Sequence, residues 1–77
     1  MQVQIMLFGQ LTDIAGNDTI VVDGVSDTDE LVQAVNILYP AITCMKYIIA
    51  VDKKAIQVNT TLNQKSTVAL LPAFSGG

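Results

Sequence analysis

One stretch of this sequence, and only one, repeats its apolar residues with the period of an amphipathic helix. These residues would share one helix face: Leu31, Ala34, Val35, Leu38 and Ile42. Asp27 followed by Glu30 resembles a capping box, and Pro40 cannot continue a helix. The pattern predicts a helix over residues 28–38. Because the other apolar segments suit strands, we expect this helix to pack across one face of a sheet, in an α+β fold.

Two strands are expected before this helix. Residues 2–8 alternate, with Val3, Ile5 and Leu7 facing inward. Turn-forming residues follow at 13–18, and residues 19–22 form a second strand. Antiparallel pairing with the first strand is the simplest arrangement.

Three further strands are expected after the helix. Residues 47–51 are apolar without alternation, which suits a strand covered on both faces or a short central one. Residues 55–58 form a short strand with Ile56 and Val58 inward, and Leu62 anchors the loop that follows. The last strand covers residues 67–71. Pro72 ends it, because proline cannot donate to a strand ladder.

The two faces of the expected sheet have different tasks. Leu31, Val35 and Leu38 of the helix should pack on the inward side chains of the first and last strands: Val3, Ile5, Leu7, Val68 and Leu70. If those two strands are neighbours, other apolar side chains face away from the helix: Met6, Phe8, Ala55, Ala69 and Leu71. An exposed apolar patch of this kind indicates a surface for a protein partner. The alternative is a scatter of ordinary surface apolar residues.

Composition removes several classes of protein. A net charge of −3 without arginine argues against nucleic-acid binding, and the absence of histidine removes the usual general base. The longest uncharged stretch, residues 31–45, is too short and too polar to span a membrane. Residues 1–12 lack the features of a secretory signal, so we expect a soluble cytoplasmic domain. Cys44 alone can form neither a disulfide framework nor a zinc ribbon.

The chain ends in Gly76-Gly77. A backbone without Cβ atoms can enter a narrow channel and be approached closely from every side. This matters if the carboxylate of Gly77 is itself the working group. The alternative is a frayed terminus without a role.

The end of the sequence carries a family resemblance. Val68-Ala69-Leu70-Leu71-Pro72, running into Phe74-Ser75-Gly76-Gly77, resembles the C-terminus of molybdopterin synthase small subunits. These are sulfur carriers of the ubiquitin-like β-grasp superfamily. The resemblance implies a single domain over residues 1–77, with a mixed sheet of about five strands, one main helix on one face, and a flexible tail at 72–77. The sequence departs from the family pattern at Asp52, at Lys65-Ser66 and at Ala73.

The same resemblance implies an activity in the synthesis of molybdenum cofactor. A partner enzyme would use ATP and magnesium to adenylate the Gly77 carboxylate, and a sulfur donor would then convert it to a thiocarboxylate. The tail would insert into a large catalytic subunit and give sulfur to cyclic pyranopterin monophosphate, forming a dithiolene. The inserted residues would be Pro72, Ala73, Phe74, Ser75 and Gly76. The implied assembly is a heterotetramer of two small and two large subunits, and this chain holds no permanent cofactor or metal.

Two other functions remain open from the sequence. A sulfur carrier of the thiamin pathway shares the Gly-Gly end and adenylation, although such chains lack this proline-containing tail. A ubiquitin-like binding module that is never activated would share only the fold. Cys44 is a weak candidate for the sulfur-carrying group, because nothing near it in sequence would activate a thiolate, and lone cysteines are more often small buried hydrophobic residues.

Overall fold

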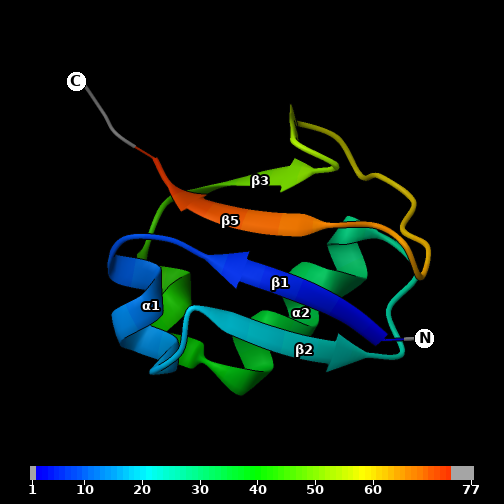
Figure 1. Cartoon of the computed structure of the whole chain (residues 1–77). Coiled ribbons are helices and arrows are strands. Elements are labelled where there is room, and N and C mark those ends of the chain that lie inside the picture. The colour runs from blue at the N-terminus through cyan, green and yellow to red at the C-terminus, as the bar shows by residue number, and fades with distance from the viewer. Residues whose placement is uncertain (1, 74–77) are drawn as a thin grey trace.

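The expected helix lies across one face of a five-stranded sheet (Figure 1). The computed structural model describes residues 2–73. Its elements in chain order are β1 (Gln2–Leu7), α1 (Gln10–Ala15), β2 (Thr19–Asp23), α2 (Thr28–Leu38), the 3₁₀ turn η1 (Pro40–Cys44), β3 (Tyr47–Val51), β4 (Lys54–Ile56) and β5 (Val68–Pro72). The bounds of α2 are those predicted from the sequence.

The sheet is mixed, with strand order β2-β1-β5-β3-β4. β1 pairs antiparallel with β2, as expected, and parallel with β5. β3 runs antiparallel to both β5 and β4. The first and last strands are therefore neighbours at the centre of the sheet, and the α+β prediction is confirmed.

The start of α2 is held by a network of side chains. The Asp27 carboxylate accepts a hydrogen bond from the Glu30 N–H at 2.9 Å, which confirms Asp27 as the N-cap. The second half of the predicted capping box is shifted by one residue, because the Glu30 side chain bonds to Ser26 rather than to Asp27. The Glu30 carboxylate accepts from both the N–H and the hydroxyl of Ser26, at 2.8 and 2.7 Å. The Asn59 amide oxygen accepts from the Asp29 N–H at 2.9 Å. These hydrogen bonds thus pair the backbone N–H groups of Ser26, Asp29 and Glu30 around the N-terminal end of α2.

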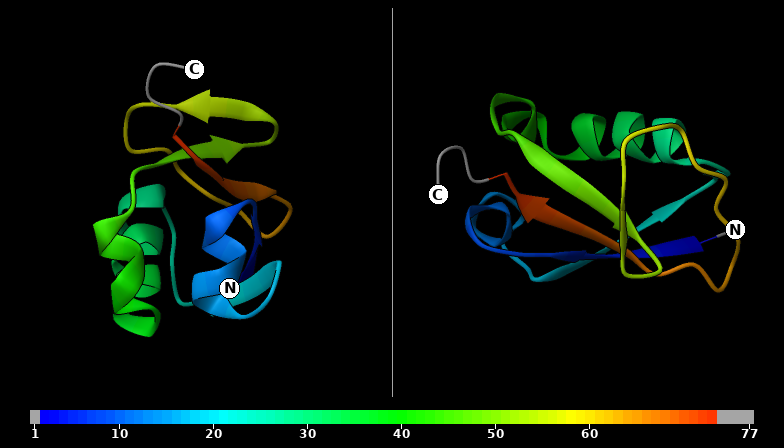
Figure 2. Two further views of the ribbon diagram at one scale, coloured as in Figure 1. Left: turned by 90° about the vertical axis from the view of Figure 1, so that its left-hand side faces the viewer. Right: turned by 90° about the horizontal axis from the view of Figure 1, so that it is seen from above.

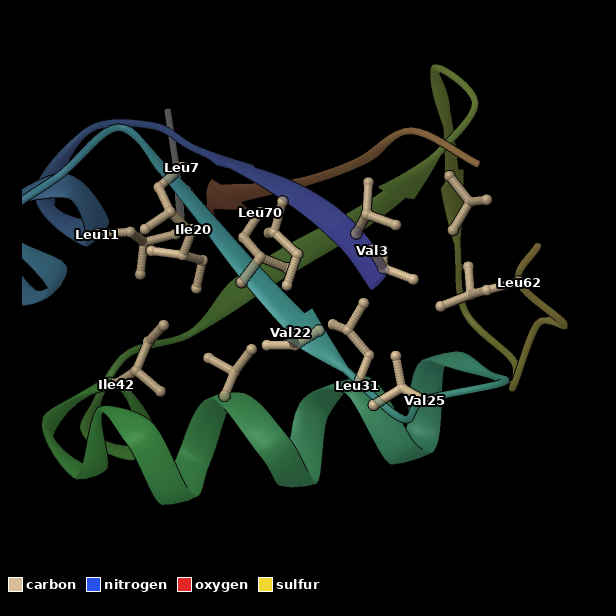
Figure 3. Close-up of a cluster of buried hydrophobic side chains, with 14 residues drawn as sticks. Val3, Leu7, Leu11, Ile20, Val22, Val25, Leu31, Ile42, Leu62 and Leu70 are labelled. Atoms are coloured by element: carbon tan, nitrogen blue, oxygen red, sulfur yellow. The ribbon is translucent and has the colours of Figure 1, made fainter. Parts of the chain in front are cut away.

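The hydrophobic core fills the space between α2 and the sheet (Figure 3). Val3, Ile5 and Leu7 of β1 are at most 2% exposed, and Val68 and Leu70 of β5 are fully buried. They meet Leu31, Val35 and Ile42 from the helical side, all at most 1% exposed. The inward faces predicted for both central strands are confirmed.

Leu38 is a correction to the predicted helix face, because its side chain is 55% exposed. The chain leaves helical geometry at Tyr39, where φ is −133°, and Pro40 begins η1. This turn brings the Tyr39 and Ile42 side chains onto the core, where the next turn of a continuing helix would otherwise have packed.

Helix α1 was not expected, since residues 13–18 were predicted to form a turn and residues 10–12 were assigned to no element. It has one buried residue, Leu11, and therefore no repeated apolar period. Gly16 ends it in the left-handed conformation at φ 75°, and the Gly16 N–H donates to the Thr12 carbonyl at 2.8 Å.

Among residues 2–73, no helix is long and apolar enough to cross a lipid bilayer.

The segment after β4 is a second correction. The predicted strand over residues 55–58 is realised only as Lys54–Ile56, and Val58 is 75% exposed rather than inward. Ile56 does pack against the core. The chain leaves the sheet after Ile56 and crosses to the start of α2. Leu62, only 4% exposed, anchors this crossing as predicted.

Two of the positions that depart from the family pattern have defined local roles. Asp52 lies in the β3–β4 turn with a positive φ of 51°, and its carboxylate accepts from the Thr67 N–H at 3.0 Å. Ser66 is buried, and its hydroxyl accepts from the Asn63 N–H at 3.0 Å. Each side chain therefore pairs a backbone N–H of the segment that leads into β5.

Candidate functional site: the uncovered sheet face and the end of β5

One face of the sheet carries no helix (Figure 2). The pairing register places four outward side chains in one row across β1, β5, β3 and β4: Met6, Ala69, Ala50 and Ala55. A second row pairs Leu71 with Ile48. Phe8 follows β1, and its N–H donates to the Leu70 carbonyl at 3.2 Å, so it continues the line beside Leu71. We call these seven residues the outward apolar face.

The side chains of the outward apolar face are accessible. Met6, Phe8 and Ile48 are 42–43% exposed, a large fraction for such apolar side chains. Ala69 and Leu71 are partly exposed between them. A shallow hollow of about 110 Å³ lies beside Met6, lined by Ala50, Ala69 and the neighbouring residues Lys53, Thr67 and Val68. The structure thus gathers the five residues expected from sequence on one face.

Ile48 and Ala50 are members of this face that the sequence did not single out. All five residues of β3 are apolar, so alternation could not separate inward from outward positions. The only usable signal was the register with β5, where Ile48 faces Leu71 and Ala50 faces Ala69.

The end of β5 lies next to this face, at the same end of the sheet as α1 (Figure 1). Pro72 is the last residue of β5 and pairs with Tyr47. The Ala73 N–H donates to the Lys46 carbonyl at 3.0 Å. We call Pro72 and Ala73 the tail root. The other predicted tail residues, Phe74, Ser75, Gly76 and Gly77, lie outside the described residues.

Two ionisable residues, Lys46 and Tyr47, pair with the backbone of the tail root. Burial raises the pKa of the Tyr47 hydroxyl above its ordinary value of 10.0, so this group is neutral near pH 7. Lys46 is the adjacent ionisable side chain in sequence and is exposed.

Cys44 does not occupy the buried position that is usual for a lone cysteine, since the structure places it on the surface at the end of η1. Within residues 2–73, no three acidic or cysteine side chains gather in a way that could hold a metal ion. The use of ATP and magnesium by a partner enzyme stays a prediction.

Solved structures share this fold over the whole chain. Small archaeal modifier protein 1 from Haloferax volcanii superposes with a TM-score of 0.82 at 21% identity, each chain covered to 100%. Molybdopterin converting factor subunit 1 from Pyrococcus furiosus gives 0.83 at 15% identity, covering 96% of this chain and 99% of its own. A complex of subunits 1 and 2 of molybdopterin-converting factor from Helicobacter pylori gives 0.73 at 24% identity, with both chains covered to 100%. The ubiquitin-like β-grasp fold expected from the resemblance is confirmed.

No curated protein matches this sequence, but a family model does. The model of the ThiS family matches residues 5–77, from the middle of β1 through the Gly76-Gly77 pair. The match therefore includes the second half of β1, all of β5, the helix that covers them and the final glycine, and on this basis the chain belongs to the ThiS family.

Proposed function

We propose that this protein is a sulfur carrier of molybdenum cofactor synthesis and that the Gly77 carboxylate carries the sulfur. The observation that supports this most is the ThiS family match, which runs through the final Gly-Gly pair. The fold adds a second support, since β5 is a central strand and is the last element before that pair in the sequence. The carrier group would thus follow a strand fixed by neighbours on both sides.

The chemistry would take place on the terminal carbonyl. A carboxylate oxygen of Gly77 attacks the α-phosphorus of ATP, pyrophosphate leaves, and an acyl-adenylate forms. Hydrosulfide, taken as the simplest sulfur donor, then attacks the activated carbonyl carbon, displaces AMP and loses its proton, which leaves a thiocarboxylate. ATP, magnesium and the acid–base groups belong to the partner enzyme.

The tail and the neighbouring structures support the choice of pathway. The Leu70–Pro72 segment, followed by the Gly-Gly pair, resembles the C-terminal sequence of molybdopterin synthase small subunits. Two of the similar structures are molybdopterin converting factor subunits, one of them in complex with subunit 2. We therefore propose a large synthase subunit as the second partner and cyclic pyranopterin monophosphate as the sulfur acceptor.

A reconstitution separates this pathway from the thiamin pathway. The thiocarboxylated chain is supplied to a molybdopterin synthase large subunit with cyclic pyranopterin monophosphate and, separately, to a thiazole synthase with its substrates. We expect dithiolene product in the first reaction only. Product in the second reaction alone would assign the chain to thiamin synthesis. If no adenylating enzyme activates the chain, the remaining interpretation is a ubiquitin-like binding module.

The outward apolar face is the proposed docking surface for both partners. Phe8→Ala and Leu71→Ala should each weaken binding of the large subunit at least about fivefold, because buried apolar anchors commonly contribute more than about 1 kcal/mol. Titration calorimetry measures the affinity, with Ile37→Ala as the matched control. Ile37 is apolar and 79% exposed, but it lies on α2 in the other layer. Equal affinities for all three folded variants would show that docking uses another surface.

A further inference from the structure

We propose that Gly9 is a positioning residue for sulfur loading, because its bare backbone seats the Pro72 ring and so fixes the tail root. Gly9 lies between β1 and α1, and Pro72 ends β5. The inference rests on the proposed function, since it concerns where the chain segment that ends in Gly77 begins.

The contact leaves no space for a side chain at residue 9. A Cβ atom added to Gly9 would lie 2.7 Å from Cγ of Pro72 and 3.5 Å from its Cδ. Real Cβ atoms essentially never approach so closely, and a proline ring cannot rotate away as a flexible side chain could. Gly9 also has φ 59° and ψ −136°, a mirror-image extended conformation that belongs to glycine. Two independent properties of this position therefore require glycine.

Both sides of the contact are held in place. Before Gly9, the Phe8 N–H donates to the Leu70 carbonyl. The Gly9 carbonyl accepts from the Thr12 hydroxyl at 2.7 Å and from the Thr12 N–H at 3.1 Å. On the other side, the Ala73 N–H of the tail root donates to the carbonyl of Lys46, the residue before β3. A methyl group at residue 9 must therefore displace either the Gly9 backbone or the Pro72 ring. The tail root is the less constrained of the two, because the strand register pairs Pro72 only with Tyr47 of β3.

A displaced tail root would affect chemistry more than docking. Gly77 lies four residues after Ala73, and four extended residues span at most about 14 Å. Under the proposed function, a displaced tail root therefore changes how far the Gly77 carboxylate can reach, and a misplacement of about 1 Å between reacting groups can cost about 100-fold in rate. Most of the outward apolar face would stay in place, since Met6, Ala50, Ala55 and Ala69 are held by strand pairs that do not involve Gly9 or Pro72. Unusual backbone geometry of this kind is often found at functional sites.

The test compares single and double variants of the full chain. Gly9→Ala should lower kcat for adenylation at least about tenfold while KM for the chain changes less than threefold, because docking persists. Gly16→Ala is the matched control: Gly16 also has a positive φ, at 75°, but no atom lies within 4 Å of an added Cβ. It should lose stability without losing kcat. In the Pro72→Ala background, where the ring is absent, Gly9→Ala should change kcat less than threefold.

The Ala73 amide gives a readout that does not depend on activity. Its hydrogen exchange should accelerate in Gly9→Ala and return toward its starting rate when Pro72→Ala is added. Wild-type kcat in Gly9→Ala, or an equal loss in Gly16→Ala, would overturn the positioning role. If Gly9→Ala lowers kcat equally in the wild-type and Pro72→Ala backgrounds, the positioning role is also wrong. This comparison applies even if the single variant folds poorly. A wild-type chain that is never adenylated would instead contradict the proposed function, and the Ala73 exchange would still decide the contact.

Discussion

Deletion of Gly77 is expected to abolish thiocarboxylate formation while the domain stays folded. The residue lies beyond β5, and every residue of the hydrophobic core precedes it. Its loss moves the terminal carboxylate back by one residue, about 3.3–3.6 Å along an extended chain. Reacting atoms must be held within about 3–3.5 Å of each other, so the carboxylate leaves the reach of the partner's site.

Addition of one residue after Gly77 should have the same effect, because the error in position is equal and opposite. Gly76→Val should also fail, since a branched side chain would obstruct a channel built for bare backbone. Circular dichroism and thermal melting provide the folding control for all three variants. Full sulfur loading of the Gly77-deleted chain would contradict the carrier mechanism, and loss of folding would assign the tail a structural role.

Leu31→Ala should cost about 2–5 kcal/mol of the free energy of unfolding, the range measured for buried leucines. Leu31 is fully buried between α2 and the central strands. Stabilities of whole domains are about 5–15 kcal/mol, so the loss is a large fraction of the total. For a domain of this size the melting temperature should fall by at least about 8 °C.

Leu38→Ala is the matched control for this prediction. It removes the same atoms from the same helix, but Leu38 is 55% exposed, so its cost should stay within about 0.5 kcal/mol. Urea denaturation of both variants measures the difference directly. Equal losses for the two leucines would show that the buried face of α2 has been assigned incorrectly.

The central fold could be predicted because its signals are local. Alternation in β1 and the cap and period of α2 each lie within a dozen residues, and the structure follows them. Leu38 and Val58 continue their local patterns but not the fold, because the chain turns at Tyr39 and leaves the sheet after Ile56. Helix α1 is too short to show a period. In all three places tertiary packing decides what a local pattern cannot.

In the candidate site, too, some residues follow from a local pattern and others depend on the tertiary arrangement. Outward parity on β1 and β5 was enough to place Met6 and Leu71 on one face, once those strands were taken as neighbours. Ile48 required the register of β3 against β5, which no local pattern in an all-apolar strand can give. The seat of Pro72 on Gly9 joins residues from opposite ends of the chain, and only the folded arrangement reveals it.

The most direct test of the carrier mechanism is a mass measurement on Gly77. The chain is incubated with an adenylating enzyme, ATP, magnesium and a sulfur donor, and its C-terminal fragment is then analysed by mass spectrometry. We predict a gain of about 16 Da, from replacement of one oxygen by sulfur in the covalent product, confined to the fragment that contains Gly77. A fragment of unchanged mass, or sulfur located on Cys44 instead, would contradict the account.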